Sequence, residues 1–320
     1  MRIKRKIGYS VLLFLLCLLV AFCTVLSLSR HNSSNVLQES VHSVTQETAE
    51  GQADGASKNE SIAAHSVLVQ DILTLAKLDG AVHGIFLAYP DESDTPILQD
   101  DKKMRSASMI KVFILADAME QVKAGQLSLS DKIVLRHEDK VGGSGILSGY
   151  PDGTSLSLEK LLTLMITESD NTATNLVIQQ LGMDSINQYM QAHGYVNSSL
   201  QRKMMDADAV RAGRENYTSA KDLGIFFSRL YHSSCVGGSQ DEKMREILFG
   251  QTDTECFPQA LPNVKIAHKT GELDHLYSDG GIIYGAAGED MVLVVLSDDY
   301  ENRAKTIEMM RKIARRAFHR

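Results

Sequence analysis

Hydrophobic residues along this chain fall into three stretches with different patterns. The first is an uncharged apolar run from about Gly8 to Leu28, and basic residues at positions 2 and 4–6 precede it. At ~1.5 Å per residue, a run of this length can cross a hydrocarbon layer of ~30 Å. Basic residues on its N-terminal side favour a cytoplasmic start and an exported remainder. We therefore expect residues 1–29 to form a single-pass membrane anchor; the alternative is a signal segment, cleaved near Ser29, with secretion of the rest.

The second stretch, residues 30–64, is rich in Ser, Glu, Gln, Thr and Gly and contains few large apolar residues. A segment of this composition cannot bury enough surface to form a packed core by itself. It is expected to be a disordered linker between the membrane and a folded domain.

The third stretch, residues 65–320, carries the periodic patterns of a folded domain. Helical spacing recurs at its start, in a long middle block and at its end, whereas strand-like runs lie near both ends. The expected strands cover residues 82–89, 96–99, 264–268, 280–284 and 291–296. This order predicts an α/β fold in which both ends of the domain contribute to one antiparallel sheet beside an all-helical middle region.

Composition narrows the classes of function. The chain has 320 residues, of which 43% are hydrophobic and 23% charged, enough for one substantial core. Its net charge of −7 argues against a nucleic-acid partner, because phosphate binding needs clustered basic residues. No spacing of His and Cys suggests a zinc site, and no glycine-rich phosphate loop is present, so neither a metal nor a cofactor is expected. Nothing in the exported part demands an assembly, and a monomer is expected.

Three short strings carry the candidate chemistry, in this order: Ser108-Met-Ile-Lys111, Ser169-Asp-Asn171 and Lys269-Thr-Gly271. Each string is weak alone, and a second serine-to-lysine pair occurs at Ser157-Leu-Glu-Lys160. That second pair is interpreted as the cap of another helix. The order and the element types of the three strings together point to a serine acyl-transfer enzyme.

The first two strings supply a nucleophile and its activation. Ser108 and Lys111 are three residues apart at the start of a helix, so the amine can reach the hydroxyl. Lys111 can accept its proton only if neighbouring groups depress the pKa of the amine. Ser169 is expected to relay a proton to the leaving nitrogen. Asn171 would hold a substrate amide or steady Lys111, whereas Asp170 is expected to cap a helix.

The third string supplies substrate contacts at the end of a strand. Lys269 can place a cation beside a substrate carboxylate, and Thr270 can donate a hydrogen bond to it. Gly271 allows the backbone and the substrate to approach closely. The N–H of Glu272, together with that of Ser108, would form the oxyanion hole.

These strings and their surroundings resemble class A β-lactamases and the penicillin-binding serine hydrolases over about residues 66–320. The resemblance extends to Gly143-Ser-Gly-Ile-Leu147, to the segment 166–176 around the second string and to Ile266-Ala-His-Lys-Thr-Gly-Glu272. It implies a β-lactamase/transpeptidase-like fold, an acyl-enzyme on Ser108 and β-lactam hydrolysis without a metal.

The chain departs from that family at two places. Class A enzymes usually carry a Glu-x-x-Leu-Asn segment whose glutamate activates the deacylating water, and residues 202–216 lack it before the pair Arg214-Glu215. Asp206 and Asp208 are the candidate replacements; the alternative is that both are solvated surface residues. No arginine lies between Arg245 and Arg303, so either His275 or Arg303 assists Lys269 in binding a carboxylate, or the substrate differs from that of the family.

Two of the four cysteines, Cys235 and Cys256, lie in the exported part, where an oxidising compartment permits a disulfide. The alternative is two unpaired thiols. The favoured function is a membrane-tethered serine β-lactamase that acts on small β-lactams. A D,D-peptidase or penicillin-binding protein that acts on peptidoglycan peptides with slow deacylation comes second, and a non-catalytic cell-wall binding protein third.

Overall fold

The computed structural model describes residues 55–90, 95–286 and 289–320. The predicted anchor, residues 1–29, and most of the predicted linker lie outside these residues. The chain divides into two units, Met1–Val67 and Leu68–Arg320. The described part of the first unit is the start of helix α2 (Gly55–Leu75). Within the described part of the chain, no helix is both long enough and apolar enough to cross a bilayer.

Helix α2 begins inside the stretch that we expected to be a linker. That expectation rested on the scarcity of large apolar residues, which argues against a packed core. The same scarcity does not prevent a local helix, because Ala, Lys and Glu are favourable in helices without any tertiary contact. The predicted boundary between linker and folded domain, at residues 64 and 65, falls inside this helix.

The second unit is organised around a five-stranded antiparallel sheet, in the order β2-β1-β9-β8-β7. Its strands are β1 (Val82–Ala88), β2 (Leu98–Gln99), β7 (Lys265–Leu273), β8 (Leu276–Tyr284) and β9 (Met291–Asp298). The β1–β9 pairing, for example Phe86 opposite Val294, joins strands from the two ends of the unit, as the sequence predicted. β7 lies at one edge of the sheet, and this position leaves one side of the strand free of a neighbouring strand.

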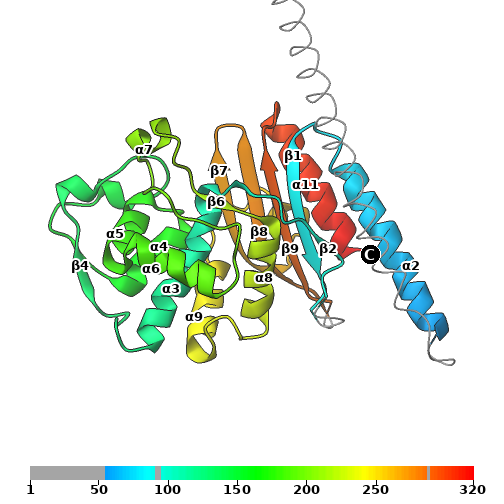
Figure 1. The fold of residues 1–320 in the computed structure, drawn as a ribbon, viewed down its shortest axis with the longest axis horizontal. Coiled ribbons are helices and arrows are strands. Elements are labelled where there is room, and N and C mark those ends of the chain that lie inside the picture. Colours follow the sequence, from blue (N-terminus) through cyan, green and yellow to red (C-terminus); the bar gives the residue numbers. More distant parts are fainter. Residues whose placement is uncertain (1–54, 91–94, 287–288) are drawn as a thin grey trace, which may run out of the picture. The chain divides into compact units, whose positions relative to one another are not determined.

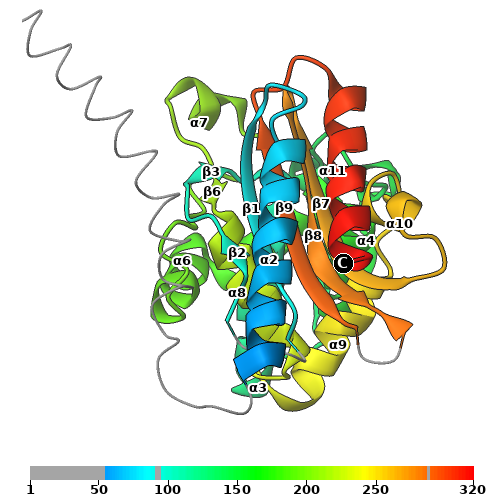
Figure 2. The same ribbon diagram turned by 90° about the vertical axis from the view of Figure 1, so that its right-hand side faces the viewer.

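Helices cover both faces of this sheet, which explains why β9 is buried almost throughout. One face packs against α11 (Arg303–Phe318), α10 (Phe257–Ala260) and the part of α2 from Leu68 onward. The other face packs against α8 (Ala220–Tyr231), α9 (Gly238–Phe249) and the turn η1 (Ala107–Ile110). Figures 1 and 2 show these two layers of helices on opposite sides of the strands.

The all-helical region is built around α3 (Lys111–Lys123), whose residues from Lys111 to Met119 are all buried. The other helices of this region are α4 (Leu158–Thr167), α5 (Asn171–Leu181), α6 (Met183–Ala192) and α7 (Ala207–Arg211). Two small ladders border it, β3 (Met104–Arg105) with β6 (Tyr217–Thr218) and β4 (Lys132–Val134) with β5 (Ser155–Ser157), together with the 3₁₀ turns η2 (His137–Asp139) and η3 (Leu147–Gly149).

The second serine-to-lysine pair has the structural role that the sequence indicated. The Ser157 hydroxyl accepts a hydrogen bond from the Lys160 N–H at 3.2 Å, and Ser157 is the N-cap of α4. A side chain that satisfies an unpaired amide at a helix start stabilises that helix. This pair therefore belongs to the scaffold.

The predicted disulfide between Cys235 and Cys256 is wrong. Both cysteines are free and buried. Cys235 packs in the core on the helical side of the sheet, where its sulfur lies 3.7 Å from the Tyr189 hydroxyl. Cys256 packs in the core beneath α11, on the opposite face. A bridge is excluded because the sheet separates the two thiols.

Candidate active site

Ser108 lies where η1 runs into α3. The turn starts in strained backbone, since Ala107 has a φ of 44°, a value that residues with a Cβ rarely adopt. Ala107, Met109 and Ile110 are buried, whereas Ser108 is partly exposed. The surrounding fold thus presents this serine at the surface of a rigid, buried turn.

Strand β7 passes directly beside this serine. A Cβ atom at Gly271 would lie 3.1 Å from the Ser108 amide nitrogen, which is tighter than ordinary packing. A glycine therefore lets the backbone of β7 approach the Ser108 amide. This close approach supports the prediction that the amides of Ser108 and Glu272 form an oxyanion hole.

Lys111 is completely buried and bound by the second string. Its Nζ donates to the Ser169 carbonyl at 2.7 Å, to the Ser169 Oγ at 3.2 Å and to the Asn171 Oδ1 at 3.1 Å. Burial, and then the positive charge of Lys269, lower the pKa of Lys111 well below its usual value, while Asp170 opposes the shift. This is the depressed amine that a lysine base needs.

Ser169 joins the two lysines. Its Oγ accepts from the Lys269 Nζ at 3.1 Å as well as from Lys111, and its backbone has a φ of 49°. Lys269 is also fully buried, and its Nζ donates to the Thr270 carbonyl at 2.7 Å. Burial lowers the pKa of Lys269 to about 7, while Asp253 and Asp279 raise it. Two amines that share one hydroxyl repel each other when both are charged, so their protonation is coupled.

Asp170 and Asn171 hold the Ser169 turn in place. Asp170 caps α5 by accepting from the Ala173 N–H at 2.8 Å, and its second oxygen accepts from the Ile146 and Leu147 amides, each at 2.7 Å. Asn171 donates to the Gly142 carbonyl at 3.2 Å. Both the oxygen and the nitrogen of the Asn171 side-chain amide are therefore engaged, and the residue steadies Lys111 and the neighbouring loop.

Thr270 and Glu272 differ in position from Lys269 and Gly271. Thr270 is 5% exposed, and its cross-strand partner is Asp279, which is completely buried. Glu272 is half-exposed, and its carboxylate accepts two hydrogen bonds from Arg303, at 2.7 and 3.1 Å. The side chain of Glu272 thus points to α11, while its backbone lies next to Gly271.

The loop over residues 202–216 is closed at its neck by an ion pair between residues near its two ends. Glu215 pairs with Arg202, whose Nε and second guanidinium nitrogen lie 2.9 and 2.6 Å from the Glu215 Oε1. The Asn216 side chain closes the same neck through the Gln201 and Arg202 amides, at 2.7 and 3.0 Å. These contacts join the two ends of the loop.

The two candidate water-activating acids have other partners. Asp206 is the N-cap of α7 and accepts from the Ala209 N–H at 2.9 Å. The side chain of Asp208 is 87% exposed and pairs with Arg211 on the same helix. The structure therefore gives both carboxylates a local role at α7, which is the surface alternative that the sequence left open.

Sequence reasoning missed Met204 and Asn175. The Met204 N–H donates to the Asn175 Oδ1 at 2.8 Å, and the Asn175 Nδ2 donates to the Met204 carbonyl at 3.0 Å. Asn171 and Asn175 are four residues apart on α5 and therefore lie on one face of the helix. Met204, 7% exposed, is thus held one helical turn from the residue that binds Lys111. The i, i+4 spacing of the two asparagines was the signal for this contact.

Neither proposed helper of Lys269 has a free charge. The His275 side chain is exposed, and its Nδ1 lies 2.8 Å from the Tyr300 carbonyl, a contact that raises the pKa of the ring. Arg303 is held by Glu272 and, through two further hydrogen bonds of 2.8 Å, by Glu255. Among the described residues, no group of three or more His, Cys, Asp or Glu side chains could hold a metal ion.

Ser108, Lys111, Ser169 and Lys269 therefore belong to one site, formed by two fully buried amines, a shared hydroxyl and a partly exposed serine. A family model described as the beta-lactamase enzyme family matches residues 67–320, almost the whole folded part of the chain. The chain belongs to the beta-lactamase enzyme family. It is a serine hydrolase of that family.

Individual members of the beta-lactamase family resemble this chain to different extents. The chain is 26% identical to the beta-lactamase VEB-1 of Pseudomonas aeruginosa over 136 residues, 42% of this chain and 46% of that protein, so it spans less than half of this relative's length. A solved beta-lactamase from Sphaerobacter thermophilus is 27% identical with a TM-score of 0.72, covering 79% of this chain and 96% of that one.

A structure of PBP-A shares the fold of this beta-lactamase family member. It superimposes with a TM-score of 0.72 at 24% identity, over 79% of this chain and 95% of that chain. The β-lactamase/transpeptidase-like architecture expected from the sequence is confirmed by these neighbours.

Proposed function

We propose that the protein opens β-lactam rings by forming an acyl-enzyme on Ser108, and that it hydrolyses this intermediate with deacylation as the slow step. The observation that supports acylation best is the Ser169 hydroxyl, which lies within hydrogen-bond distance of both Lys111 and Lys269. The Ser169 hydroxyl, which can carry a proton, thus links Lys111, a base whose pKa is lowered, to the cation of Lys269.

The residues take the following roles in acylation. The Ser108 Oγ attacks the lactam carbonyl, and its proton passes to the neutral amine of Lys111. The developing oxyanion is stabilised by the backbone amides of Ser108 and Glu272. When the C–N bond breaks, Ser169 donates its proton to the leaving nitrogen and is reprotonated from the lysine pair. Lys269, whose side chain is on the same side of β7 as the Ser108 turn, binds the substrate carboxylate.

Deacylation needs a base that activates water within hydrogen-bond reach of the ester. Asp206 and Asp208 are engaged at α7, and the buried residue that the loop places beside α5 is the apolar Met204. This observation favours a second candidate function, a D,D-peptidase or penicillin-binding protein that acts on peptidoglycan peptides. In support, a variant of PBP-A has been solved as an acyl-enzyme complex with penicillin G.

The test is a time course of intact-protein mass after the full-length chain is mixed with a penicillin. An adduct that forms and then disappears while hydrolysed penicillin accumulates supports the β-lactamase proposal. An adduct that persists supports the penicillin-binding alternative. No adduct on the wild-type protein would sink both, and the Ser108→Ala variant provides the blank.

We also propose that residues 1–29 anchor the protein in the membrane with the catalytic domain outside the cytoplasm. The apolar run from about Gly8 to Leu28 and the basic residues before it support this location. Fractionation of cells that express the full chain should place it in the membrane fraction, and alkaline extraction should leave it there. Recovery in the medium would instead support cleavage near Ser29.

A further inference from the structure

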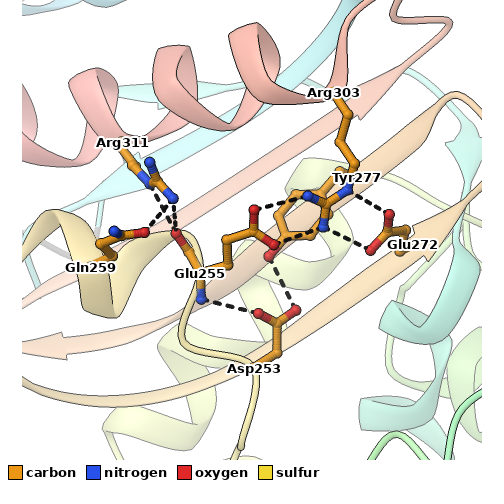
Figure 3. Close-up of polar contacts among 7 residues, drawn as sticks. All are labelled: Asp253, Glu255, Gln259, Glu272, Tyr277, Arg303 and Arg311. Carbon is orange, nitrogen blue, oxygen red and sulfur yellow. Dashed lines mark hydrogen bonds and ion pairs between the residues drawn. The ribbon is translucent and has the colours of Figure 1, made fainter.

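A polar cluster lies along the side of edge strand β7 that faces away from Ser108. We call it the Arg303 cluster, and its members are Asp253, Glu255, Glu272, Tyr277 and Arg303 (Figure 3). Because side chains alternate along a strand, Glu272 projects from the side opposite to Gly271. Its cross-strand partner Tyr277 lies on the same side. The cluster therefore occupies the back of the strand that carries the third motif.

Arg303 connects two separate segments in this cluster. Its guanidinium donates two hydrogen bonds to Glu272 on β7 and two to Glu255 in the segment before α10. It also lies over the Tyr277 ring, 5.2 Å from the centroid. Bidentate pairs of this kind fix geometry as well as charge. One cation between two carboxylates leaves a net charge of −1.

The position of Arg303 at the start of α11 indicates that its role is to bind Glu255 and Glu272. It is the first residue of α11, and the first turn of α11 contains no acid. A cation at a helix N-terminus is disfavoured by the helix dipole. Glu255 and Glu272 compensate for this cost, but a neutral or acidic residue would stabilise the helix without them. Helix stability alone therefore gives no reason for an arginine at this position.

The hydrogen bonds from Arg303 to Glu255 also hold Asp253 in place. The Glu255 N–H donates to the Asp253 Oδ1 at 3.1 Å, and the Tyr277 hydroxyl donates to the Asp253 Oδ2 at 3.1 Å. Arg311, two turns further along α11, donates to the Glu255 carbonyl at 2.9 and 2.6 Å. The segment that carries Asp253 is thus tied to α11 at two points and to β8 at a third.

Lys269 depends on such distant charges because its hydrogen-bond partners are the neutral oxygens of Ser169 and Thr270. The charged groups around the two lysines come from four parts of the fold. For Lys111 they are the amine of Lys269 on β7 and Asp170 at the start of α5. For Lys269 they are Asp253 before α10 and Asp279 on β8, the last paired with His268.

We propose that Arg303 is a positioning residue for the acyl-transfer site. It holds Asp253 and the end of β7 in place behind Lys269, and through them it controls the charge that Lys269 presents to the substrate. The inference rests on the proposed function, since it concerns the cation that binds the substrate carboxylate in that reaction.

The consequence is a pH dependence with a defined sign. Acylation by an anionic β-lactam requires protonated Lys269, so the rate falls as the pH rises through the Lys269 pKa of about 7. Arg303→Gln leaves the carboxylates of Glu255 and Glu272 without their cation. This change raises the Lys269 pKa and moves the descending limb of the pH–rate profile to higher pH. Asp253→Asn removes a carboxylate and moves the limb to lower pH. A unit charge acting over roughly 10 Å gives shifts of about 0.3 to 1 pH unit.

The experiment measures the second-order labelling rate of the full-length chain by a fluorescent penicillin carboxylate, from about pH 5 to about pH 9. The variants are Arg303→Gln, Arg303→Lys and Asp253→Asn. We expect opposite shifts for Arg303→Gln and Asp253→Asn, and a limb at the wild-type pH for Arg303→Lys, which restores the charge. A merely structural role would change the rate without moving the limb in opposite directions.

Lys305→Gln is the matched control, because Lys305 is an exposed cation on the same turn of α11. An equal shift in Lys305→Gln, or shifts of the same sign in Arg303→Gln and Asp253→Asn, overturns the inference. If Arg303→Gln fails to fold, the Asp253→Asn shift against the control decides. If the wild-type protein is not labelled at any pH, the proposed function itself fails. If the protein is labelled but the variants do not shift its pH dependence, only the inference about Arg303 fails.

Discussion

Two of the serines in this protein can be compared as candidate nucleophiles, Ser108, which is three residues from Lys111 in the sequence, and Ser297, which contacts His83 in the fold. Besides Ser108, the chain contains a Ser–His–Asp series, in which the His83 Nδ1 lies 2.9 Å from the Ser297 Oγ and the His83 Nε2 lies 2.7 Å from the Asp79 Oδ1. By residue type and by these two distances, this series resembles a catalytic triad. Its serine, however, is completely buried.

The difference lies in access and in the backbone around each serine. Ser297 is in β9, between its ladder partners His83 on β1 and Tyr277 on β8, so strands flank it on both sides. Ser108 starts a helix and lies against the glycine of an edge strand. A nucleophile needs space for a substrate and unpaired amides for the oxyanion, and a central strand provides neither. The triad-like series is therefore a structural element that joins the segment before β1 to β9.

The largest expected effect comes from removing each hydroxyl in turn. Ser108→Ala should abolish covalent labelling by penicillin, a loss of at least about 10³-fold, because no other group supplies the nucleophile. Ser297→Ala should leave the labelling rate within about a factor of two. Intact-protein mass spectrometry measures both. Loss of labelling in Ser297→Ala, with the protein still folded, would reverse the assignment of the two serines.

The next effect concerns the base. Lys111→Met keeps the length and the burial of the side chain but removes the amine, and we expect acylation to slow by about 10² to 10⁴-fold. The rate of acyl-enzyme formation in stopped flow gives the measurement. His83→Gln is the matched variant in the other series and should leave this rate unchanged. Equal losses in the two variants would mean that stability, and not proton transfer, limits the reaction.

The third prediction adds a carboxylate to the active site, a group that the Ser297–His83–Asp79 series already contains. Met204→Glu places an acid one helical turn from Asn171 and should accelerate deacylation by about 10-fold or more through activation of water. The lifetime of the penicillin adduct reports this change. Met204→Gln has the same shape without the charge and is the control. A lifetime that shortens equally in both variants would attribute the effect to a loosened loop.

Many features of the site could be predicted from the sequence because they are local. A serine and a lysine three residues apart and a Ser-Asp-Asn turn between two helices each fix a geometry within a few residues. The expectation that the Lys-Thr-Gly string ends a strand is wrong, because β7 continues to Leu273 and the string lies inside it. The pair Arg202 and Glu215 could not be read in the same way, since the ion pair closes a loop and an adjacent arginine, Arg214, was available. Asp206 and Asp208 had the right charge, but only the capped helix α7 shows where that charge goes.

The fold was predictable to a similar extent. Strands near both ends of the domain with helices between them left few arrangements, and the observed sheet is the expected one. Composition was misleading where it was used as a proxy for structure, at the start of α2. The predicted disulfide failed for a related reason, because the number of exported cysteines carries no information about which face of the sheet each one occupies.

The smallest expected effect is on the stability of the Ser297 region. Ser297→Ala should lower the free energy of unfolding by about 1 to 2 kcal/mol, because it leaves the buried Nδ1 of His83 without its hydrogen-bond partner. Urea titration followed by circular dichroism measures this loss. His83→Gln should cost a similar amount, and a loss additive with that of Ser297→Ala would show that the two side chains do not act together.

The same region makes a prediction about acid. Burial raises the pKa of Asp79, but the nearby Thr306 hydroxyl and the hydrogen bond with His83 lower it, so that it lies below its ordinary value of 3.8. A carboxyl group with a lowered folded pKa stabilises the protein above its unfolded pKa, and this contribution disappears as the pH falls through the folded value. The free energy of unfolding of Asp79→Asn should therefore depend less on pH below about pH 4 than that of the wild type. An unchanged acid transition would show that other carboxylates dominate it.

The two thiols, which form no disulfide and lie on opposite faces of the sheet, can report separately on local opening of the two halves of the core. Burial raises the pKa of Cys235 to about 12 and that of Cys256 well above its usual value, so each reacts with a thiol reagent only when its core opens. With Cys17 and Cys23 replaced by serine, the two alkylation rates would time the helical side and the α11 side separately. The order in which the halves of this molecule come apart can thus be measured without adding a single probe.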